Sequence, residues 1–251
     1  MSGITRVGLD VRQMDMPSTG WTPLPQVVAR RLQQMILDGE LGEGDQLPSQ
    51  RLLSERFRVS RASLREALLM LETLGLIKTE PGRGTFVAAR KPDPTTALKW
   101  RYSDSYSMQE VFETRQMLEG QIAHSAAQNI DAPGLSILHD ATADMERFWE
   151  AGDLLANVEA DLRFHRSIVQ CCTNRMLISL YETVQVLLTE TQRQPIPRTN
   201  PTRMRASLCE HRQIIAAIAR ADGNAAQKAM MDHVRNTAAC AGVEIASPLA
   251  R

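Results

Sequence analysis

An aspartate and three histidines in the second half of the chain have the types and spacing of residues that act together. Asp161 and His165 are four residues apart, so they project from the same face of one predicted helix. That face also carries the apolar residues Val158, Ile168, Val169 and Cys172. A carboxylate on a buried face is costly unless it is paired, hydrogen-bonded or bound to a cation.

Two further histidines fall on the apolar faces of later helices. His211 lies on the stripe of Leu208, Ile214, Ile215 and Ile218, and His233 on that of Ala226, Ala229, Met230 and Thr237. Three helices therefore each direct a ligand-type side chain into their bundle. Imidazoles together with a carboxylate suit a divalent transition metal, and we expect zinc before nickel or manganese.

Each of these four residues also has a purely structural interpretation. An inward histidine can be a hydrogen-bonded core residue, and Asp161 can pair with an arginine. The set is harder to explain residue by residue, because three of the five histidines of the chain fall on apolar faces and one has an aspartate four residues before it. His124 and His139 lack such neighbours and are interpreted as surface or core residues.

A cluster of arginines in the first half of the chain has the pattern of a nucleic-acid contact. Arg51 stands at the start of one predicted helix, and Arg61, Ser63 and Arg65 stand at the start of the next. Long cationic side chains at these positions suit both phosphate and guanine. The net charge of the whole chain is zero, but a local patch can bind DNA without a basic total charge.

Two short helices and a tight turn position these arginines. Ser49 can cap the first helix and Ser60 the second. The expected inward residues are Leu52, Leu53 and Phe57 in the first helix and Leu64, Ala67, Leu68, Leu71 and Leu74 in the second, which stops at Gly75. Residues 76–78 and 85–87 are short β-prone runs around a basic turn. The combination predicts a winged helix-turn-helix domain, whereas the alternative is a plain helical hairpin with solvated arginines.

The remaining sequence predicts a mainly α-helical protein. One helix is expected at about 25–38, and beyond residue 108 only helical patterns occur, at about 108–128, 132–151, 153–172, 175–194, 202–221 and 223–243. Short connections between the last six predict an antiparallel bundle. We therefore expect a flexible tail at 1–21, the winged domain at 22–88, a linker at 89–107 and a helical domain at 108–244.

Composition excludes several classes of protein. No apolar run is long enough to cross a membrane, and the first residues lack the apolar segment of a signal peptide. The four cysteines have no disulfide or metal spacing. These features predict a cytoplasmic protein with reduced thiols.

Three motifs resemble the winged-helix domain of GntR-family bacterial transcription regulators. They are Leu47-Pro48-Ser49-x-Arg51-x-Leu53-Ser54, Val59-Ser60-Arg61-x-x-Leu64-Arg65-Glu66-Ala67-Leu68 and Gly82-x-Gly84-Thr85-x-Val87. The resemblance implies that Arg51, Arg61 and Arg65 contact operator DNA and that Gly82, at the wing tip, enters the minor groove. The chain departs from the family pattern at Gln50, where glutamate is usual, and at Pro81, where some members have a base-contacting side chain.

The second half resembles the FCD ligand-binding domain, which defines the FadR-type subfamily of these regulators. The matching residues are Glu113-x-Arg115-x-x-Leu118-Glu119, Asp161-x-x-x-His165, Glu210-His211-x-x-Ile214 and His233-Val234. The resemblance implies that Asp161, His165, His211 and His233 bind a metal and that Arg115 faces the effector cavity. A guanidinium there could clamp a carboxylate with two hydrogen bonds; the alternative is an exposed ion pair with Glu119.

These observations predict a ligand-responsive transcription regulator that is not an enzyme. Two subunits would bind a pseudo-palindromic operator, each with its second helix in a major groove. A small carboxylate or sugar acid would bind the metal and Arg115 and change the affinity for the operator. A homodimer, and repression rather than activation, are implied by the resemblance.

Two other functions could use the same residues. An enzyme could activate water on the metal, but no further carboxylate or histidine is left as a general base, since Glu210 is expected to point away from the site. A metal-sensing regulator would respond to the ion itself, without a small molecule.

Overall fold

The computed structural model describes residues 24–89 and 100–245. These form two compact units, which come before and after this gap in the sequence. The expected tail at 1–21 lies outside the described residues, and so do residues 90–99 of the expected linker. Residues 101–105 of that linker form turns.

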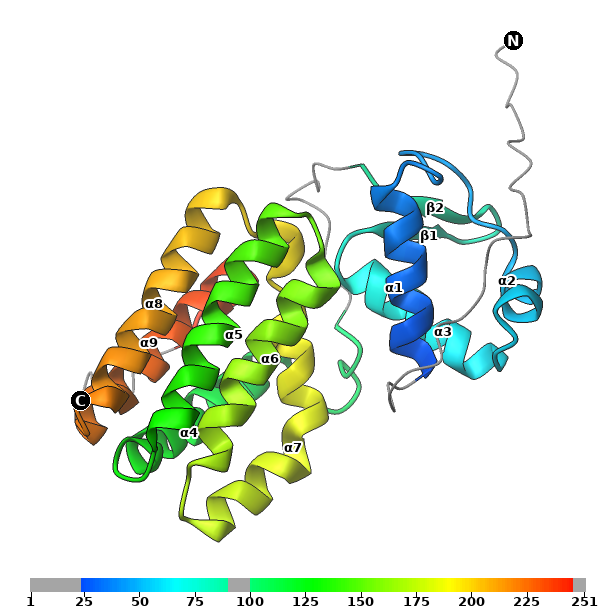
Figure 1. Cartoon of the computed structure of the whole chain (residues 1–251). Coiled ribbons are helices and arrows are strands. Elements are labelled where there is room, and N and C mark those ends of the chain that lie inside the picture. The colour runs from blue at the N-terminus through cyan, green and yellow to red at the C-terminus, as the bar shows by residue number, and fades with distance from the viewer. Residues whose placement is uncertain (1–23, 90–99, 246–251) are drawn as a thin grey trace. The chain divides into compact units, whose positions relative to one another are not determined.

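The first unit is a winged helix-turn-helix (Figure 1), as the sequence predicted. Its helices are α1 (Leu24–Leu37), α2 (Gln50–Phe57) and α3 (Arg61–Thr73). Strand β1 (Ile77–Glu80) pairs antiparallel with β2 (Gly84–Val87), in a register that places Ile77 opposite Val87 and Glu80 opposite Gly84. Buried side chains of α1 and α3 hold these two helices together.

Capping residues set the helix ends around the turn. The Ser49 hydroxyl accepts a hydrogen bond from the Leu52 amide, and the Ser60 hydroxyl accepts one from the Ser63 amide at 3.0 Å. Gly75 follows α3 with a φ of +71°, a left-handed conformation that glycine adopts without steric cost.

The expected inward position of Leu52 was wrong. Its exposed fraction is 37%, whereas Leu53 and Phe57 are buried. Successive residues of a helix are rotated by about 100°. The stripe of α2 that packs inward runs through Leu53 and Phe57, and Leu52 is rotated out of it.

The second unit is an all-helical bundle, again as predicted. Its helices are α4 (Met108–Ala127), α5 (Ala132–Glu150), α6 (Leu154–Gln170), α7 (Arg175–Arg193), α8 (Pro201–Ala219) and α9 (Gly223–Cys240), with a 3-10 turn, η2 (Ile196–Arg198), between α7 and α8. Figure 1 shows α5 and α6 side by side, and they also contact each other closely. None of the described helices is long and apolar enough to cross a membrane.

Helix α4 lies at the centre of the bundle. It packs against α6, α7, α8 and α9, so residues on several of its sides are buried, among them Phe112 and Ile122. Ser107 caps it with a capping box, in which the Ser107 hydroxyl accepts from the Glu110 amide and the Glu110 carboxylate accepts from the Ser107 amide. A polar residue on one of the sides that face these helices has no route to solvent and must find partners inside the protein.

Leu71→Ala should destabilise the winged unit, because Leu71 of α3 is fully buried. We expect the free energy of unfolding of this unit to fall by about 2–5 kcal/mol, the usual cost of truncating a buried leucine to alanine. Amide hydrogen exchange distinguishes the units, and exchange should accelerate in residues 24–89 but not in 100–245. Leu52→Ala, which truncates an exposed leucine of the same unit, is the control. Equal exchange in the two variants would contradict this core assignment.

Candidate metal centre and nucleic-acid interface

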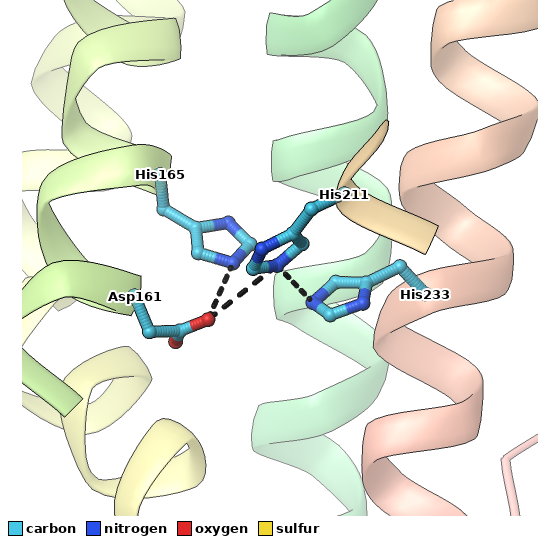
Figure 2. A group of neighbouring side chains, drawn as sticks. All are labelled: Asp161, His165, His211 and His233. Atoms are coloured by element: carbon cyan, nitrogen blue, oxygen red, sulfur yellow. Dashed lines mark hydrogen bonds and ion pairs between the residues drawn. The ribbon is translucent and has the colours of Figure 1, made fainter. Parts of the chain in front are cut away.

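Asp161, His165, His211 and His233 come together inside the helical unit (Figure 2). Helix α6 supplies Asp161 and His165, α8 supplies His211 and α9 supplies His233. The candidate ligand atoms of the four side chains all lie within 4.8 Å of one another. The structure thus brings together all four residues that the sequence predicted as metal ligands.

The spacing of the ligand atoms fits a first-row divalent ion. His211 Nε2 lies 3.3 Å from His233 Nε2 and 3.5 Å from Asp161 Oδ1, and His165 Nε2 lies 3.7 Å from the same oxygen. Ligands about 2.0–2.1 Å from a tetrahedral ion are roughly 3.3–3.4 Å apart. Small side-chain movements would therefore complete such a shell, and three imidazoles with one carboxylate form a donor set suited to transition metals.

Burial keeps His211 and His233 in a form that can bind a metal. The pKa of His211 lies well below its ordinary value because burial disfavours the charged imidazolium, and the nearby His233 and His165 add to the effect. Burial also lowers the pKa of His233, although Glu210 acts in the opposite direction. A neutral ring offers a lone pair, so metal binding does not first require the loss of a proton.

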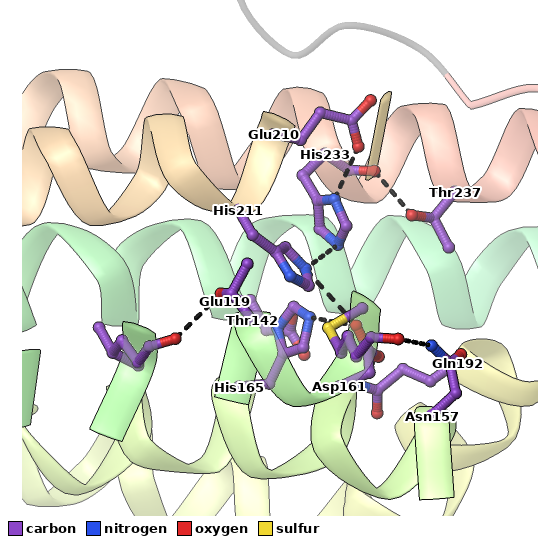
Figure 3. Close-up of polar contacts among 12 residues, drawn as sticks. Glu119, Thr142, Asn157, Asp161, His165, Gln192, Glu210, His211, His233 and Thr237 are labelled. Carbon is purple, nitrogen blue, oxygen red and sulfur yellow. Dashed lines mark hydrogen bonds and ion pairs between the residues drawn. The ribbon is translucent and has the colours of Figure 1, made fainter. Parts of the chain in front are cut away.

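Two glutamates, the buried Glu119 and the partly buried Glu210, lie on the far side of the histidine rings (Figure 3). Glu210 Oε2 accepts a hydrogen bond from His233 Nδ1 at 2.8 Å. Glu119 Oε2 lies 3.0 Å from His165 Nδ1, close enough for an ion pair. Neither glutamate was identified from the sequence as a site residue. Glu210 lies outside the cluster of candidate ligand atoms, but it contacts His233 from behind, which the sequence did not reveal. Its side chain reaches across to α9, which packs along α8.

Arginines hold both glutamates in the ionised form. Burial alone would raise the pKa of Glu119, but Arg115 and His165 outweigh it and lower this pKa to about 2. Burial likewise opposes ionisation of Glu210, but hydrogen bonds from His233 and Arg203 outweigh it and lower its pKa to about 2. Both carboxylates are therefore negative near neutral pH and attract the N–H groups of the rings.

Arg115 is completely buried on α4. Its Nε lies 3.2 Å from both carboxylate oxygens of Glu119, and its Nη1 lies 3.4 Å from the Thr191 hydroxyl. Its Nη2 lies 3.2 Å from His165 Nε2, the nitrogen that faces the cluster. The ion pair with Glu119 is thus present but buried, in contrast to the exposed pair that was the alternative. This guanidinium reaches the edge of the candidate metal centre.

The second oxygen of Asp161 is also held. Its Oδ2 accepts a hydrogen bond from Gln192 Nε2 of α7 at 2.9 Å (Figure 3). This contact leaves Oδ1 directed at the histidines, where a metal ligand would have to be. With Arg115 and Glu119 of α4 beside His165, five helices contribute to the orientation of the carboxylate and the three rings.

A small cavity adjoins the cluster. Its lining includes Arg115, Asp161 and His233, together with Asn157 and Arg203. The cavity volume is about 40 Å³, which is room for a few water molecules at roughly 10–15 Å³ each. A sugar acid needs more space, so its binding would require the surrounding side chains to move.

The predicted DNA-contacting residues lie around α2, α3 and the wing. Arg61 and Arg65 are exposed in the first turns of α3 and have no ion-pair partner within the described residues. Arg51 is exposed on α2 and pairs with Glu55 at 2.9 Å. The partly buried Ser63 has its hydroxyl 2.9 Å from that of Ser60. Gly82 is exposed in the turn between β1 and β2, with a φ of +73°.

Comparison with known proteins gives the same division of the chain. Residues 24–87 match the gntR family of bacterial regulatory proteins, and residues 110–236 match the FCD domain. The HTH-type transcriptional regulator LutR of Bacillus subtilis is 31% identical over 80% of this chain and 94% of its own length. The Glc operon transcriptional activator of Escherichia coli is 27% identical over 85% of this chain and 87% of its own length.

A solved structure shows the same fold. Escherichia coli McbR/YncC aligns with a TM-score of 0.52 and 19% identity, covering 88% of this chain and 98% of that one. At this identity the likeness concerns the fold alone. The matched families and relatives are regulators of transcription and not enzymes.

His211→Ala should abolish metal binding, because it removes the imidazole that approaches both His233 and Asp161. We expect elemental analysis of metal-reconstituted wild-type protein to give about one ion per chain, as one four-residue site provides, and the variant to retain almost none. His139→Ala is the matched control, since His139 is exposed on α5. Full metal content in the His211 variant would refute this ligand set.

Proposed function

Because the chain belongs to the GntR family of bacterial transcription regulators and has an FCD domain, we propose that its operator affinity is controlled by a small acid bound at a metal. The observation that carries this proposal is the cluster of one carboxylate and three imidazoles beside a cavity with two arginines. A regulator of this kind combines the sensor and the DNA-binding domain in one chain.

The winged unit would bind the operator through the N-terminal end of α3. Arg61 and Arg65 are exposed there, without competing carboxylates within the described residues, and their guanidinium groups match the major-groove edge of guanine. Arg51 and Ser63 would contact the backbone, and Gly82 would bring the wing tip close to the minor groove. The partner is double-stranded operator DNA in the cytoplasm.

The helical unit would bind a divalent metal through Asp161, His165, His211 and His233. Zinc is the ion we propose first, because three nitrogens and one oxygen at these spacings suit its small shell. Nickel and manganese are the alternatives with the same donor set. When bound, the ion would supply positive charge, and expansion beyond four ligands would give an anion a place beside the four protein ligands.

A small carboxylate or sugar acid is the effector that this environment favours. A metal and the guanidinium of Arg115 would present two positive groups to the same cavity, and a carboxylate can bridge them. The acid must bind two arrangements of the bundle with different affinities if it is to change DNA binding. The small cavity supports this requirement, because a sugar acid would fit only a more open arrangement.

A homodimer would match a pseudo-palindromic operator, since each half-site then meets one α3 helix. Exposed apolar side chains on the helical unit support self-association: Met176, Leu180 and Val186 of α7 are 67%, 42% and 66% exposed, and Met117 of α4 is 61% exposed. Large exposed apolar side chains can mark a protein interface. The family resemblance favours repression of transcription over activation, although one relative is an activator.

A metal-sensing regulator is the second candidate. The volume of the cavity, about 40 Å³, favours it, because a site that holds only the ion and a few waters needs no organic ligand. In that case the operator affinity would follow the concentration of free metal alone.

Arg61→Ala and Arg65→Ala should each weaken binding to the specific operator by roughly tenfold or more, since a guanidinium paired with guanine contributes about 1–3 kcal/mol of discrimination. The operator is the duplex that the wild-type protein selects from a random pool, and fluorescence anisotropy gives its affinity relative to a scrambled duplex. Arg205→Ala removes the same charge from the exposed surface of α8 and should change little. An unchanged ratio of specific to non-specific affinity in both Arg61 and Arg65 variants would exclude this interface.

A panel of small carboxylic and sugar acids should include one that raises the melting temperature of metal-loaded protein but not of chelator-treated protein. A ligand at a hundred times its Kd stabilises the native state by about 2.7 kcal/mol. The acid found in this way should also change the operator affinity. Stabilisation by metal alone, with operator affinity that follows free metal and no response to any acid, would instead favour metal sensing.

A further inference from the structure

Glu210 is next to His211 in the chain, but its carboxylate contacts a histidine on another helix. Its Oε2 accepts a hydrogen bond from His233 Nδ1 at 2.8 Å, and the Glu210 side chain is only 13% exposed. The opposite nitrogen of the same ring, Nε2, lies 3.3 Å from His211 Nε2 (Figure 3). One ring nitrogen of His233 therefore faces the candidate metal centre and the other faces a partly buried carboxylate.

His233 is held differently from the other two histidines. The Nδ1 of His165 lies 3.0 Å from Glu119 without hydrogen-bond alignment, and the Nδ1 of His211 has no hydrogen-bond partner within the described residues. A carboxylate that accepts from Nδ1–H selects the tautomer with its lone pair on Nε2 and increases the basicity of that nitrogen. Within this part of the chain, only His233 has its tautomer fixed by an aligned bond to a carboxylate.

Glu210 is itself fixed by an arginine. Arg203 donates from Nη1 to Oε1 at 2.9 Å and from Nη2 to Oε2 at 3.0 Å. Asn236 donates from Nδ2 to Oε1 at 2.9 Å. With His233, these contacts give the carboxylate four hydrogen bonds from three side chains, so its position and its orientation are both determined. Arg203 also lines the cavity, so the series of contacts runs from the cavity wall to the centre.

We propose that Glu210 is a positioning residue of the metal centre and that Arg203 acts through it, so that the series Arg203–Glu210–His233 sets the affinity for the ion. The inference rests on the proposed metal site and adds two residues that do not themselves bind the ion. Glu210 orients and polarises the ring of His233, and the two hydrogen bonds from Arg203 hold the Glu210 carboxylate in place. Loss of either residue weakens metal binding with the four ligands intact.

The test measures Zn²⁺ affinity of full-length chelator-treated protein by competition with a chromophoric chelator. Glu210→Ala should raise the Kd by about 10–100-fold, the usual effect of losing a residue that orients a metal ligand. Glu210→Gln keeps an oxygen that can accept from Nδ1–H but loses the charge, so its Kd should lie between those of wild type and Glu210→Ala. Arg203→Met should raise the Kd by less than Glu210→Ala, because Glu210 remains.

A surface ion pair on the same bundle provides the matched control. Arg212 of α8 pairs with Glu146 of α5 at 2.8 Å, and both side chains are about half exposed. Arg212→Met and Glu146→Gln alter the same kinds of residue away from the cluster and should leave the Kd unchanged. Circular dichroism and the melting temperature without metal report on folding. If Glu210→Ala does not fold, the Kd of Glu210→Gln is compared with that of wild type instead.

The absorption spectrum of bound Co²⁺ separates positioning from general stability. The visible bands depend on the geometry of the ligands, so Glu210→Ala should shift them, whereas the control variants should match wild type. Wild-type affinity and an unchanged Co²⁺ spectrum in folded Glu210→Ala would overturn this inference and leave the proposed function intact. A wild-type chain that binds neither ion would overturn the proposed metal site, and this inference with it.

Discussion

The burial of charge inside an apolar bundle is the constraint on which the rest of the helical unit depends. Arg115 is 0% exposed and Glu119 is 2% exposed, and an unpaired charge at that depth would cost several kcal/mol. Each charge therefore has partners: Glu119 and Thr191 for Arg115, and Arg203 and His233 for Glu210. The helices must pack in one register for these contacts to form, so the polar interior specifies the arrangement of the bundle.

The contacts that pair these charges also shape the candidate metal site. Carboxylates on the far side of two rings leave the inward nitrogens of His165 and His233 facing His211 and Asp161. Several acceptor atoms in a small buried volume repel one another unless a proton or a cation lies between them. The low pKa of His211 makes protonation costly, and a divalent ion would supply the missing positive charge. The same set of contacts thus accounts for the structural pairing and supports the proposed metal binding.

The sequence predicted the parts of this site that depend on one helix at a time. Asp161 and His165 share a face because they are four residues apart, and His211 and His233 lie on stripes that any helical projection identifies. The role of Glu210 depends on how α8 packs along α9, which periodicity cannot give. Arg115 illustrates the same limit, because its complete burial follows from the central position of α4, with neighbours on several sides. The inward prediction for Leu52 was wrong for a smaller reason: on a short helix, a step of one residue turns the side chain away from the buried stripe.

The proposed regulation requires that a small acid bind two arrangements of the bundle with different affinities. In this structure the cavity has room for a few waters, and its wall is made by residues of the same helices that hold the candidate ligands, including α6, α8 and α9. An acid larger than these waters must displace at least one of those helices or their side chains. Close-packed interiors deform by switching between discrete packings rather than by gradual stretching. The small cavity is consistent with the proposed switch, because an acid that fits only a more open packing would bind the two packings with different affinities.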